Sequence, residues 1–325
     1  MPVFLAAALG LCALAAAAFA FVFSATRLRY RPDAAYSRPD PTRLRWPEAA
    51  PVESFRGHDR LLFCVHGFPS TPADFLKLVE LSHELGWDLY APLLPGCGTD
   101  WRDILSTNWE QYLALASDDY RRLAPRYRRV CAVGTSMGGS LLLAMEGRLA
   151  ALGEPGPAAI ATVGSPAVVN ALLRHGVVMN PLAYFARAVG LIIPAMRPGY
   201  PDPEREGEDG DGDWKGYLGS YPRQAYSIAM GLRDMERGLA STRCPVLIMH
   251  ARRDRIVPMK NALIIAAGLK RAATELVLMD MPGATHAMHN LVLYDSVRDR
   301  VWRRILAFFE AGSDAPSAAG GADAD

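Results

Sequence analysis

The most restrictive feature of this 325-residue chain is the segment Gly134-Thr-Ser-Met-Gly-Gly139. An apolar run, 130–133, precedes it, and a helical pattern, 140–149, follows it. A strand that turns directly into a helix through Gly-x-Ser-x-Gly leaves little room at the turn, so the flanking glycines prevent collisions. Such a turn holds the serine hydroxyl above the sheet edge at a helix N-terminus, where negative charge is stabilised. We therefore predict that Ser136 is a nucleophile.

Short apolar runs alternate with longer helical patterns between about 52 and 312. Runs that are apolar throughout indicate strands covered on both faces, and their alternation with helices predicts an α/β fold with a mainly parallel sheet. Thr71 followed by Pro72 predicts a capped helix start. The predicted strands are 60–66, 89–91, 130–133, 159–163, 246–250 and 276–279, and the predicted helices include 73–85 and 109–123. The alternation stops between Pro166 and Cys244, which predicts an insertion lying over one end of the sheet.

A nucleophilic serine needs a base, and the base needs an acid that orients it. In folds with a Gly-x-Ser-x-Gly turn, the acid and then the base follow the serine along the chain. Asp254 and His286 each lie in a loop just after a predicted strand. That is the sheet edge at which an open α/β fold places its ligand crevice. We predict that Asp254 orients His286, and His289 remains an alternative base.

The oxyanion formed during attack on a carbonyl needs two hydrogen-bond donors. One is expected to be the backbone N–H of the residue after the nucleophile, which is Met137. The other should come from the loop after an earlier strand, where Phe68 follows His66-Gly67.

The remaining acidic and imidazole side chains are expected to have structural or solvent-exposed roles. Asp280 ends its own predicted strand, and Asp234 lies in a helical pattern. The same expectation applies to four histidines: His58, His66, His83 and His175.

The acidic run 204–213 resembles a calcium-binding loop only superficially. Its alternating aspartates are followed by residues that do not fit such a loop, with Trp214 at the glycine position and Ser220 at the glutamate position. We expect a solvated loop. The aspartates are Asp209, Asp211 and Asp213.

Composition excludes several other classes of protein. The net charge of +1 argues against a nucleic-acid-binding protein, which usually carries a basic excess. The five cysteines are scattered and form no Cys-x-x-Cys pair, so neither a disulfide framework nor a zinc site of that kind is expected.

The first 25 residues hold an uncharged stretch, 3–23, which as a helix would span roughly 30 Å, the thickness of a bilayer core. Three arginines follow it, so we predict a single-pass membrane anchor with the folded domain on the cytoplasmic side. The alternative is a cleaved signal with Ala18-Phe19-Ala20 at the cleavage site, which predicts a secreted or periplasmic protein. Residues 26–51 are rich in Pro and Arg and predict an extended linker, and 313–325 predict a disordered tail.

The chain resembles bacterial carboxylesterases and monoacylglycerol lipases of the α/β-hydrolase superfamily over roughly 60–310. The resemblance rests on motifs that occur in the same order: His66-Gly-Phe-Pro-Ser-Thr-Pro72, Leu94-Pro-Gly-Cys-Gly98, Thr107-Asn-Trp109, Gly134-Thr-Ser-Met-Gly-Gly139, and the Asp254 and His286 loops. It implies an eight-stranded, mainly parallel sheet with a helical cap, and no metal or organic cofactor. By its motifs, the triad falls on Ser136, Asp254 and His286, the oxyanion donors on Phe68 and Met137, and the elbow glycines on Gly134 and Gly138. Cys97 departs from the family pattern, in which a histidine commonly stands at this position.

These predictions converge on a serine carboxylic-ester hydrolase that acts through an acyl-enzyme. Its apolar insertion favours a lipid-derived ester such as a monoacylglycerol. A thioesterase or an amidase would use the same triad. A non-catalytic binding or scaffold protein at the membrane is the alternative of a different class.

Overall fold

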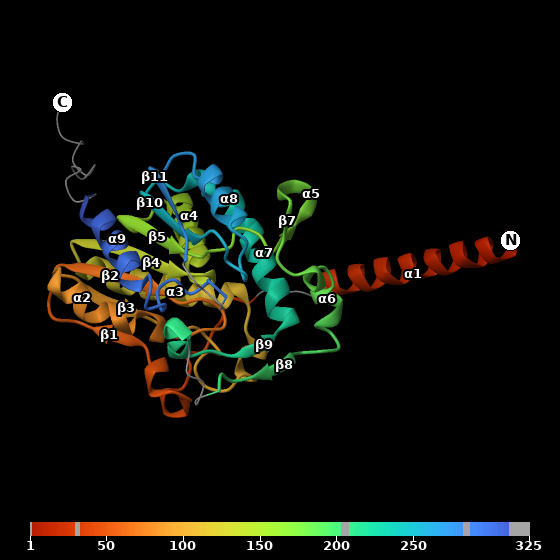
Figure 1. Cartoon of the computed structure of the whole chain (residues 1–325), viewed down its shortest axis with the longest axis horizontal. Helices are drawn as coiled ribbons and strands as arrows, with labels where there is room; N and C mark the ends of the chain where they lie inside the picture. Colours follow the sequence, from red (N-terminus) through yellow and green to blue (C-terminus); the bar gives the residue numbers. More distant parts are fainter. Residues whose placement is uncertain (1, 30–32, 203–207, 282–286, 312–325) are drawn as a thin grey trace.

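The fold is built around one central sheet, shown in Figure 1 for the computed structural model, which describes residues 2–29, 33–202, 208–281 and 287–311. Seven strands form the sheet in the order β1-β3-β2-β4-β5-β10-β11. All neighbours are parallel except β1, which pairs with β3 in the antiparallel direction. The bounds are β1 Val52–Ser54, β2 Arg60–Val65, β3 Asp88–Ala91, β4 Arg129–Thr135, β5 Ala159–Val163, β10 Val246–Ala251 and β11 Thr274–Met279. The predicted fold class is confirmed, with seven strands within these residues where eight were expected.

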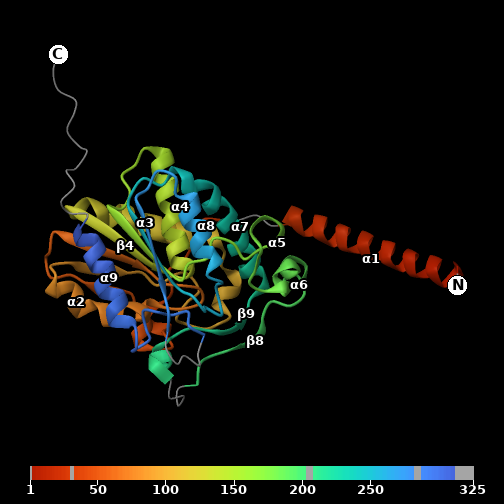
Figure 2. The same cartoon turned by 45° about the horizontal axis from the view of Figure 1, so that its top comes forward.

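The side chains of each strand alternate between two apolar clusters, one on each face of the sheet. Leu61 and Phe63 of β2 belong to one cluster, and Leu62 and Cys64 belong to the other. The first face is covered by α3, α4, α7 and α8, and the second by α2 and α9, as Figure 2 also shows. Burial on both faces explains why the strands read as continuous apolar runs. The bounds are α2 Val79–Glu84, α3 Trp109–Leu123, α4 Met137–Leu152, α7 Pro222–Gly238, α8 Lys260–Gly268 and α9 Arg298–Ala311.

The helix predicted over 73–85 is divided into a 3-10 segment, η3 Pro72–Leu78, and the short α2. Thr71 precedes η3, but its hydroxyl makes no capping hydrogen bond. It donates instead to the carbonyl oxygen of Lys215 at 2.9 Å. The predicted Thr71 cap is therefore wrong, because the hydroxyl binds the insertion to the loop after β2. By contrast, α3 has the predicted bounds and begins at Asn108 with a capping box.

The insertion 166–244 combines short helices with two small hairpins. β6 pairs with β7 in a hairpin, and β8 pairs with β9 across a longer connection, both pairs being antiparallel. The long helix α7 returns the chain to the sheet and packs against α4 and α6. The remaining bounds are β6 Asn170–Ala171, α5 Leu172–His175, β7 Val177–Val178, α6 Ala186–Val189, β8 Met196–Gly199 and β9 Leu218–Ser220.

The acidic run lies partly in η7, Glu208–Asp213, while 204–207 are outside the described residues. The Asp209 carboxylate accepts hydrogen bonds from the backbone N–H and the hydroxyl of Ser296, at 2.7 and 2.6 Å. Asp213 forms an ion pair with Lys77 at 3.7 Å. These contacts hold this part of the run against the body of the domain, while Asp213 and the hydrogen bonds of Asp209 stay exposed to solvent, in agreement with the expected solvated loop.

The N-terminal helix α1, Pro2–Arg29, extends away from the body of the molecule (Figures 1 and 2). It meets the insertion where the ring of Phe19 packs edge-on against Phe185, with ring centroids 5.9 Å apart. Within the described part of the chain, no helix has the length and apolarity needed to cross a membrane. The predicted single-pass anchor and the membrane localisation are therefore wrong.

The described part of the predicted linker, 33–51, contains two 3-10 turns, η1 Pro41–Arg43 and η2 Pro47–Ala49. It is nevertheless bound to the folded domain. Arg38 forms two hydrogen bonds to the carboxylate of Asp119 in α3, at 2.6 and 3.0 Å. The guanidinium of Arg45 lies 3.5 Å from the ring centroid of Tyr200. The predicted tail, 313–325, lies outside the described residues.

Candidate active site

The sharp turn at Ser136 has the geometry that the sequence predicts. Ser136 stands between β4 and α4 with φ 49° and ψ −124°, a strained conformation for a residue other than glycine. A Cβ atom on Gly134 would lie 2.3 Å from the nitrogen of Gly139, and one on Gly138 would lie 2.0 Å from the carbonyl oxygen of Val65. The turn can therefore form only with glycine at both positions.

Asp254 is paired with His289. Its Oδ2 atom lies 2.7 Å from the Nδ1 atom of His289, and its side chain is 1 % exposed. Oδ1 accepts the backbone N–H groups of Ile256 and Val257, both at 2.8 Å. These bonds fix the carboxylate, so Nδ1 of His289 carries a proton and Nε2 is left as a proton acceptor.

His286 lies outside the described residues, so its prediction as the base is not tested by this geometry. The path of the loop explains why His289 reaches Asp254. The N–H of Arg255 donates to the carbonyl oxygen of Ala287 at 2.9 Å, which brings the residues just before His289 alongside the Asp254 loop. The sequence analysis favoured His286 because it lies nearer the end of the preceding strand. That distance along the chain does not show which histidine the loop brings to Asp254.

Ser136 and His289 both lie against the C-terminal end of β5. The N–H of Ser136 donates to the carbonyl oxygen of Val163 at 2.7 Å. The ring of His289 covers the next residue, Gly164, where a Cβ atom would lie 3.2 Å from Cε1 of the ring. Val163, the last residue of β5, and Gly164, the residue after it, thus contact the predicted nucleophile and the ring of His289, respectively.

The loop after β2, which carries Phe68, runs beside Ser136. A Cβ atom on Gly67 would lie 2.9 Å from the Cβ atom of Ser136. His66 holds this loop, because its Nδ1 donates to the carbonyl oxygen of Gly67 at 2.8 Å and its Nε2 accepts the N–H of Leu94 at 3.0 Å. Burial lowers the pKa of His66 to about 4, so the ring is neutral and has a structural role, as expected.

Comparison with known proteins assigns the fold to a family. Residues 62–303 match the family model described as "Alpha/beta hydrolase family". The chain belongs to this family. The predicted family and the prediction of a hydrolase enzyme are confirmed.

Relatives of this α/β hydrolase include lipolytic enzymes. The chain is 25% identical over 245 residues to a thermostable monoacylglycerol lipase of Bacillus sp. (strain H-257), an alignment that covers 75% of the chain and 88% of the relative. A structure from work on LipS and LipT, two metagenome-derived lipolytic enzymes, superposes with a TM-score of 0.68 at 22% identity and covers 82% of this chain and 98% of its own. The monoacylglycerol lipase of Paleococcus ferrophilus gives a TM-score of 0.62 at 15% identity, with coverage of 81% and 98%.

The insertion of this α/β hydrolase contacts both loops beside the elbow. Tyr217 donates its N–H to the carbonyl oxygen of Pro69 at 3.1 Å, and its hydroxyl accepts the N–H of Thr99 at 2.9 Å. The ring of Phe68 packs edge-on against Tyr221, with centroids 6.1 Å apart. Cys97 is buried, and this burial raises the pKa of its thiol to about 12. The cysteine therefore offers a neutral side chain at the position where the resemblance led us to expect a histidine.

A buried carboxyl that the sequence analysis did not single out, Asp74, connects the two loops around Ser136. Its oxygens accept hydrogen bonds from the hydroxyls of Ser70 at 2.8 Å and Thr135 at 3.2 Å. Burial raises its pKa to about 6, while its hydrogen bonds and the charge of His289 act in the opposite direction. Asp74 thus fixes the residue just before the nucleophile relative to the loop that carries Phe68.

The other candidate side chains form contacts of their own. Asp280 pairs with Arg252 at 3.3 Å, and Asp234 pairs with Arg237 at 3.3 Å, both on the surface. His175 lies 2.9 Å from Glu236. These contacts agree with the structural or solvent-exposed roles expected of them.

Proposed function

We propose that the protein is a serine carboxylic-ester hydrolase in which Ser136 is the nucleophile, His289 the base and Asp254 the residue that orients it. The Asp254–His289 pair, set against the same end of β5 as the strained Ser136, is the observation that carries the proposal. His289 replaces His286 in this assignment, because Asp254 already holds His289 at 2.7 Å.

The proposed reaction follows from these contacts. Nε2 of His289 takes the Ser136 proton as Oγ attacks the ester carbonyl, and the backbone N–H groups of Phe68 and Met137 hold the oxyanion. His289 then gives its proton to the leaving alcohol. Water attacks the acyl-enzyme by the same route and releases the acid. Asp254 keeps the proton on Nδ1 and stabilises the imidazolium.

The substrate class that we propose is an apolar acyl ester such as a monoacylglycerol. Three observations support it: the aromatic contacts of Phe68 beside the elbow, the apolar insertion, and the lipolytic relatives. A thioesterase or an amidase would use the same groups, so comparing esters, thioesters and amides as substrates identifies the leaving group.

The decisive experiment compares the full-length chain with Ser136→Ala, His289→Asn and His286→Asn on p-nitrophenyl esters from acetate to palmitate and on monoacylglycerols. Ser136→Ala and His289→Asn should each lower kcat by about 10⁴- to 10⁶-fold, because either change removes the attacking group or its base. His286→Asn should retain kcat within a few-fold and is the matched control.

Three outcomes would contradict parts of this proposal. Loss of activity in His286→Asn with activity kept in His289→Asn would restore the base predicted from the sequence. A folded wild-type chain that hydrolyses none of the esters would remove the esterase assignment. Turnover of thioesters or amides alone would leave the triad in place and change the substrate class.

A further inference from the structure

A second group of polar side chains lies at the opposite end of the sheet from Ser136. His58 stands in the turn between β1 and β2, His83 in the last turn of α2, and Asp88 at the first position of β3. They are therefore near the N-terminal ends of the strands, whereas the candidate active site is at the C-terminal ends. Nothing in the proposed ester hydrolysis uses them.

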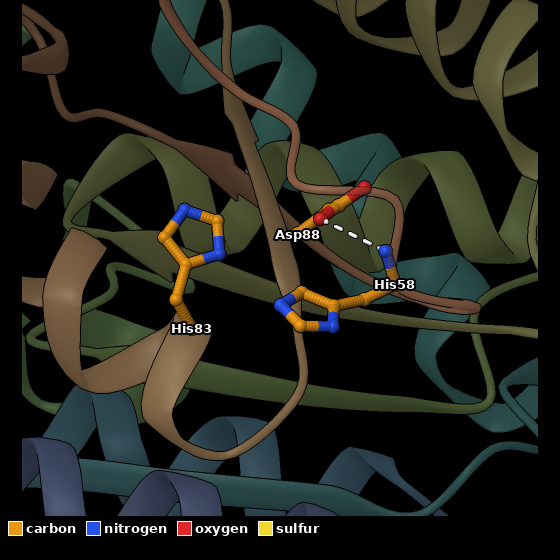
Figure 3. A group of neighbouring side chains, drawn as sticks. All are labelled: His58, His83 and Asp88. Atoms are coloured by element: carbon orange, nitrogen blue, oxygen red, sulfur yellow. Dashed lines mark hydrogen bonds between the residues drawn. The ribbon is translucent and has the colours of Figure 1, made fainter.

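The three side chains face one another, as Figure 3 shows. Each offers a nitrogen or oxygen atom suited to metal ligation, and these atoms all lie within 4.8 Å of one another. The two imidazole rings have their centroids 5.5 Å apart. His83 and Asp88 are buried, and His58 is half-buried.

Two nitrogen atoms in this group are buried without a hydrogen bond. Among the residues that the structure describes, Nε2 of His58 and Nδ1 of His83 have no partner. Figure 3 shows these ring edges turned toward each other and toward Asp88. A buried polar atom without a partner costs on the order of 1–3 kcal/mol, so a ligand that satisfies both nitrogens would be favourable.

Hydrogen bonds to neighbouring residues fix the orientation of His83 and Asp88. Nε2 of His83 lies 2.7 Å from the hydroxyl of Ser54. In the tautomer in which Nε2 donates to this hydroxyl, Nδ1 keeps its lone pair for a metal. Oδ1 of Asp88 accepts the backbone N–H groups of Arg56 at 2.9 Å and His58 at 3.3 Å, which fixes the turn that carries His58. The hydroxyl of Tyr127 donates to Oδ2 at 3.2 Å.

A neighbouring cation, Arg56, is paired with a carboxylate of its own. The guanidinium of Arg56 binds both carboxylate oxygens of Glu80, at 2.9 and 3.0 Å. The carboxylate of Asp88 therefore supplies the negative charge at the centre of the group.

We propose that His58, His83 and Asp88 form a structural binding site for a divalent transition-metal ion, with Zn²⁺ the best fit. Two imidazole nitrogens and one carboxylate are a common donor set for zinc, and the half-buried position of His58 leaves the fourth ligand to solvent. The ion would join the β1–β2 turn, α2 and the start of β3, and would stabilise this edge of the sheet.

Zinc binding by the full-length chain tests the site directly, through competition with a chromogenic zinc chelator and through the absorption of bound Co²⁺. We expect a zinc ion that binds in competition with the chelator, with affinity reduced at least tenfold in His58→Gln and in His83→Gln. Ser54→Ala keeps all three ligands and should weaken binding by about tenfold, because it removes only the group that orients His83. Zinc should also raise the melting temperature of the wild type and not that of His83→Gln.

His175→Gln is the matched control, since it removes a histidine paired with a carboxylate, Glu236, at another place in the fold. It should bind zinc as the wild type does. A chain that binds no zinc, or zinc binding that survives both His58→Gln and His83→Gln, would overturn the site and leave a water molecule as the partner of the two nitrogens. Removal of zinc should leave ester hydrolysis unchanged, so this test is independent of the proposed function.

Discussion

Two clusters of histidine and aspartate lie at opposite ends of the same sheet, and their carboxylates are used differently. At the C-terminal ends, Asp254 uses one oxygen for two backbone N–H groups and directs the other at the Nδ1 atom of His289. At the N-terminal ends, Asp88 accepts two backbone N–H groups and a tyrosine hydroxyl. The two imidazoles beside Asp88 each keep a buried nitrogen with no hydrogen bond among the described residues.

This difference separates two kinds of chemistry available to the same residue types. An imidazole whose Nδ1 is held by a carboxylate has one defined acceptor nitrogen, which suits proton transfer. Two imidazoles that face each other beside a carboxylate can direct two nitrogen lone pairs at one point, which suits a cation. The hydrogen bonds around a histidine, more than its burial, indicate which role it has.

The largest effect that we expect is a loss of kcat in Asp254→Asn. The amide would no longer hold the required tautomer of His289, so kcat should fall by about 10⁴-fold with little change in fold. Steady-state kinetics of ester hydrolysis, together with circular dichroism, measure this.

Asp88→Asn is the control for that change, because it alters the carboxylate of the other cluster. It should leave kcat within a few-fold and weaken zinc binding. Equal losses of kcat in both variants would mean that the two ends of the sheet are not functionally separate.

The pH dependence of stability should distinguish Asp74 from ordinary carboxylates. Burial holds its folded-state pKa at about 6, above the usual value of 3.8. The carboxyl therefore contributes stability while it is protonated, and this contribution is lost as the pH rises from 3.8 through 6. Relative to Asp74→Asn, the wild type should lose about 2 kcal/mol of unfolding free energy between pH 4 and pH 7. Urea unfolding of both proteins at the two pH values measures this, and a difference that does not vary with pH would contradict it.

The sequence predicts the elbow well because its determinants are local. The glycines that flank Ser136, the apolar strand before it and the helix after it are within about twenty residues, and each has a direct steric reason. The six predicted strands are also found, since burial on both faces leaves continuous apolar runs.

Features that depend on how distant segments meet could not be predicted in this way. The approach of His289 to Asp254 is accompanied by a backbone hydrogen bond between Arg255 and Ala287, which no local pattern records. Asp74 has no motif, and its role depends on Thr135, 61 residues away. The ligands of the proposed metal site come from a turn, a helix and a strand, so no cysteine or histidine spacing marks them.

The smallest effects that we expect come from adding one methyl group beside each of the two clusters. In Gly67→Ala the new Cβ would lie 2.9 Å from Cβ and 3.6 Å from Oγ of Ser136, so it should displace the nucleophile and lower kcat by about 10- to 100-fold. In Gly57→Ala, in the turn before His58, no atom lies within 4 Å of the new Cβ, but φ is +85°. Only backbone strain should result, with a loss of about 1 kcal/mol of stability and an unchanged kcat.

Kinetics and urea unfolding of the two variants measure both quantities. An unchanged kcat in Gly67→Ala would show that the loop carrying Phe68 can move away from Ser136, and would weaken its assignment as the oxyanion loop.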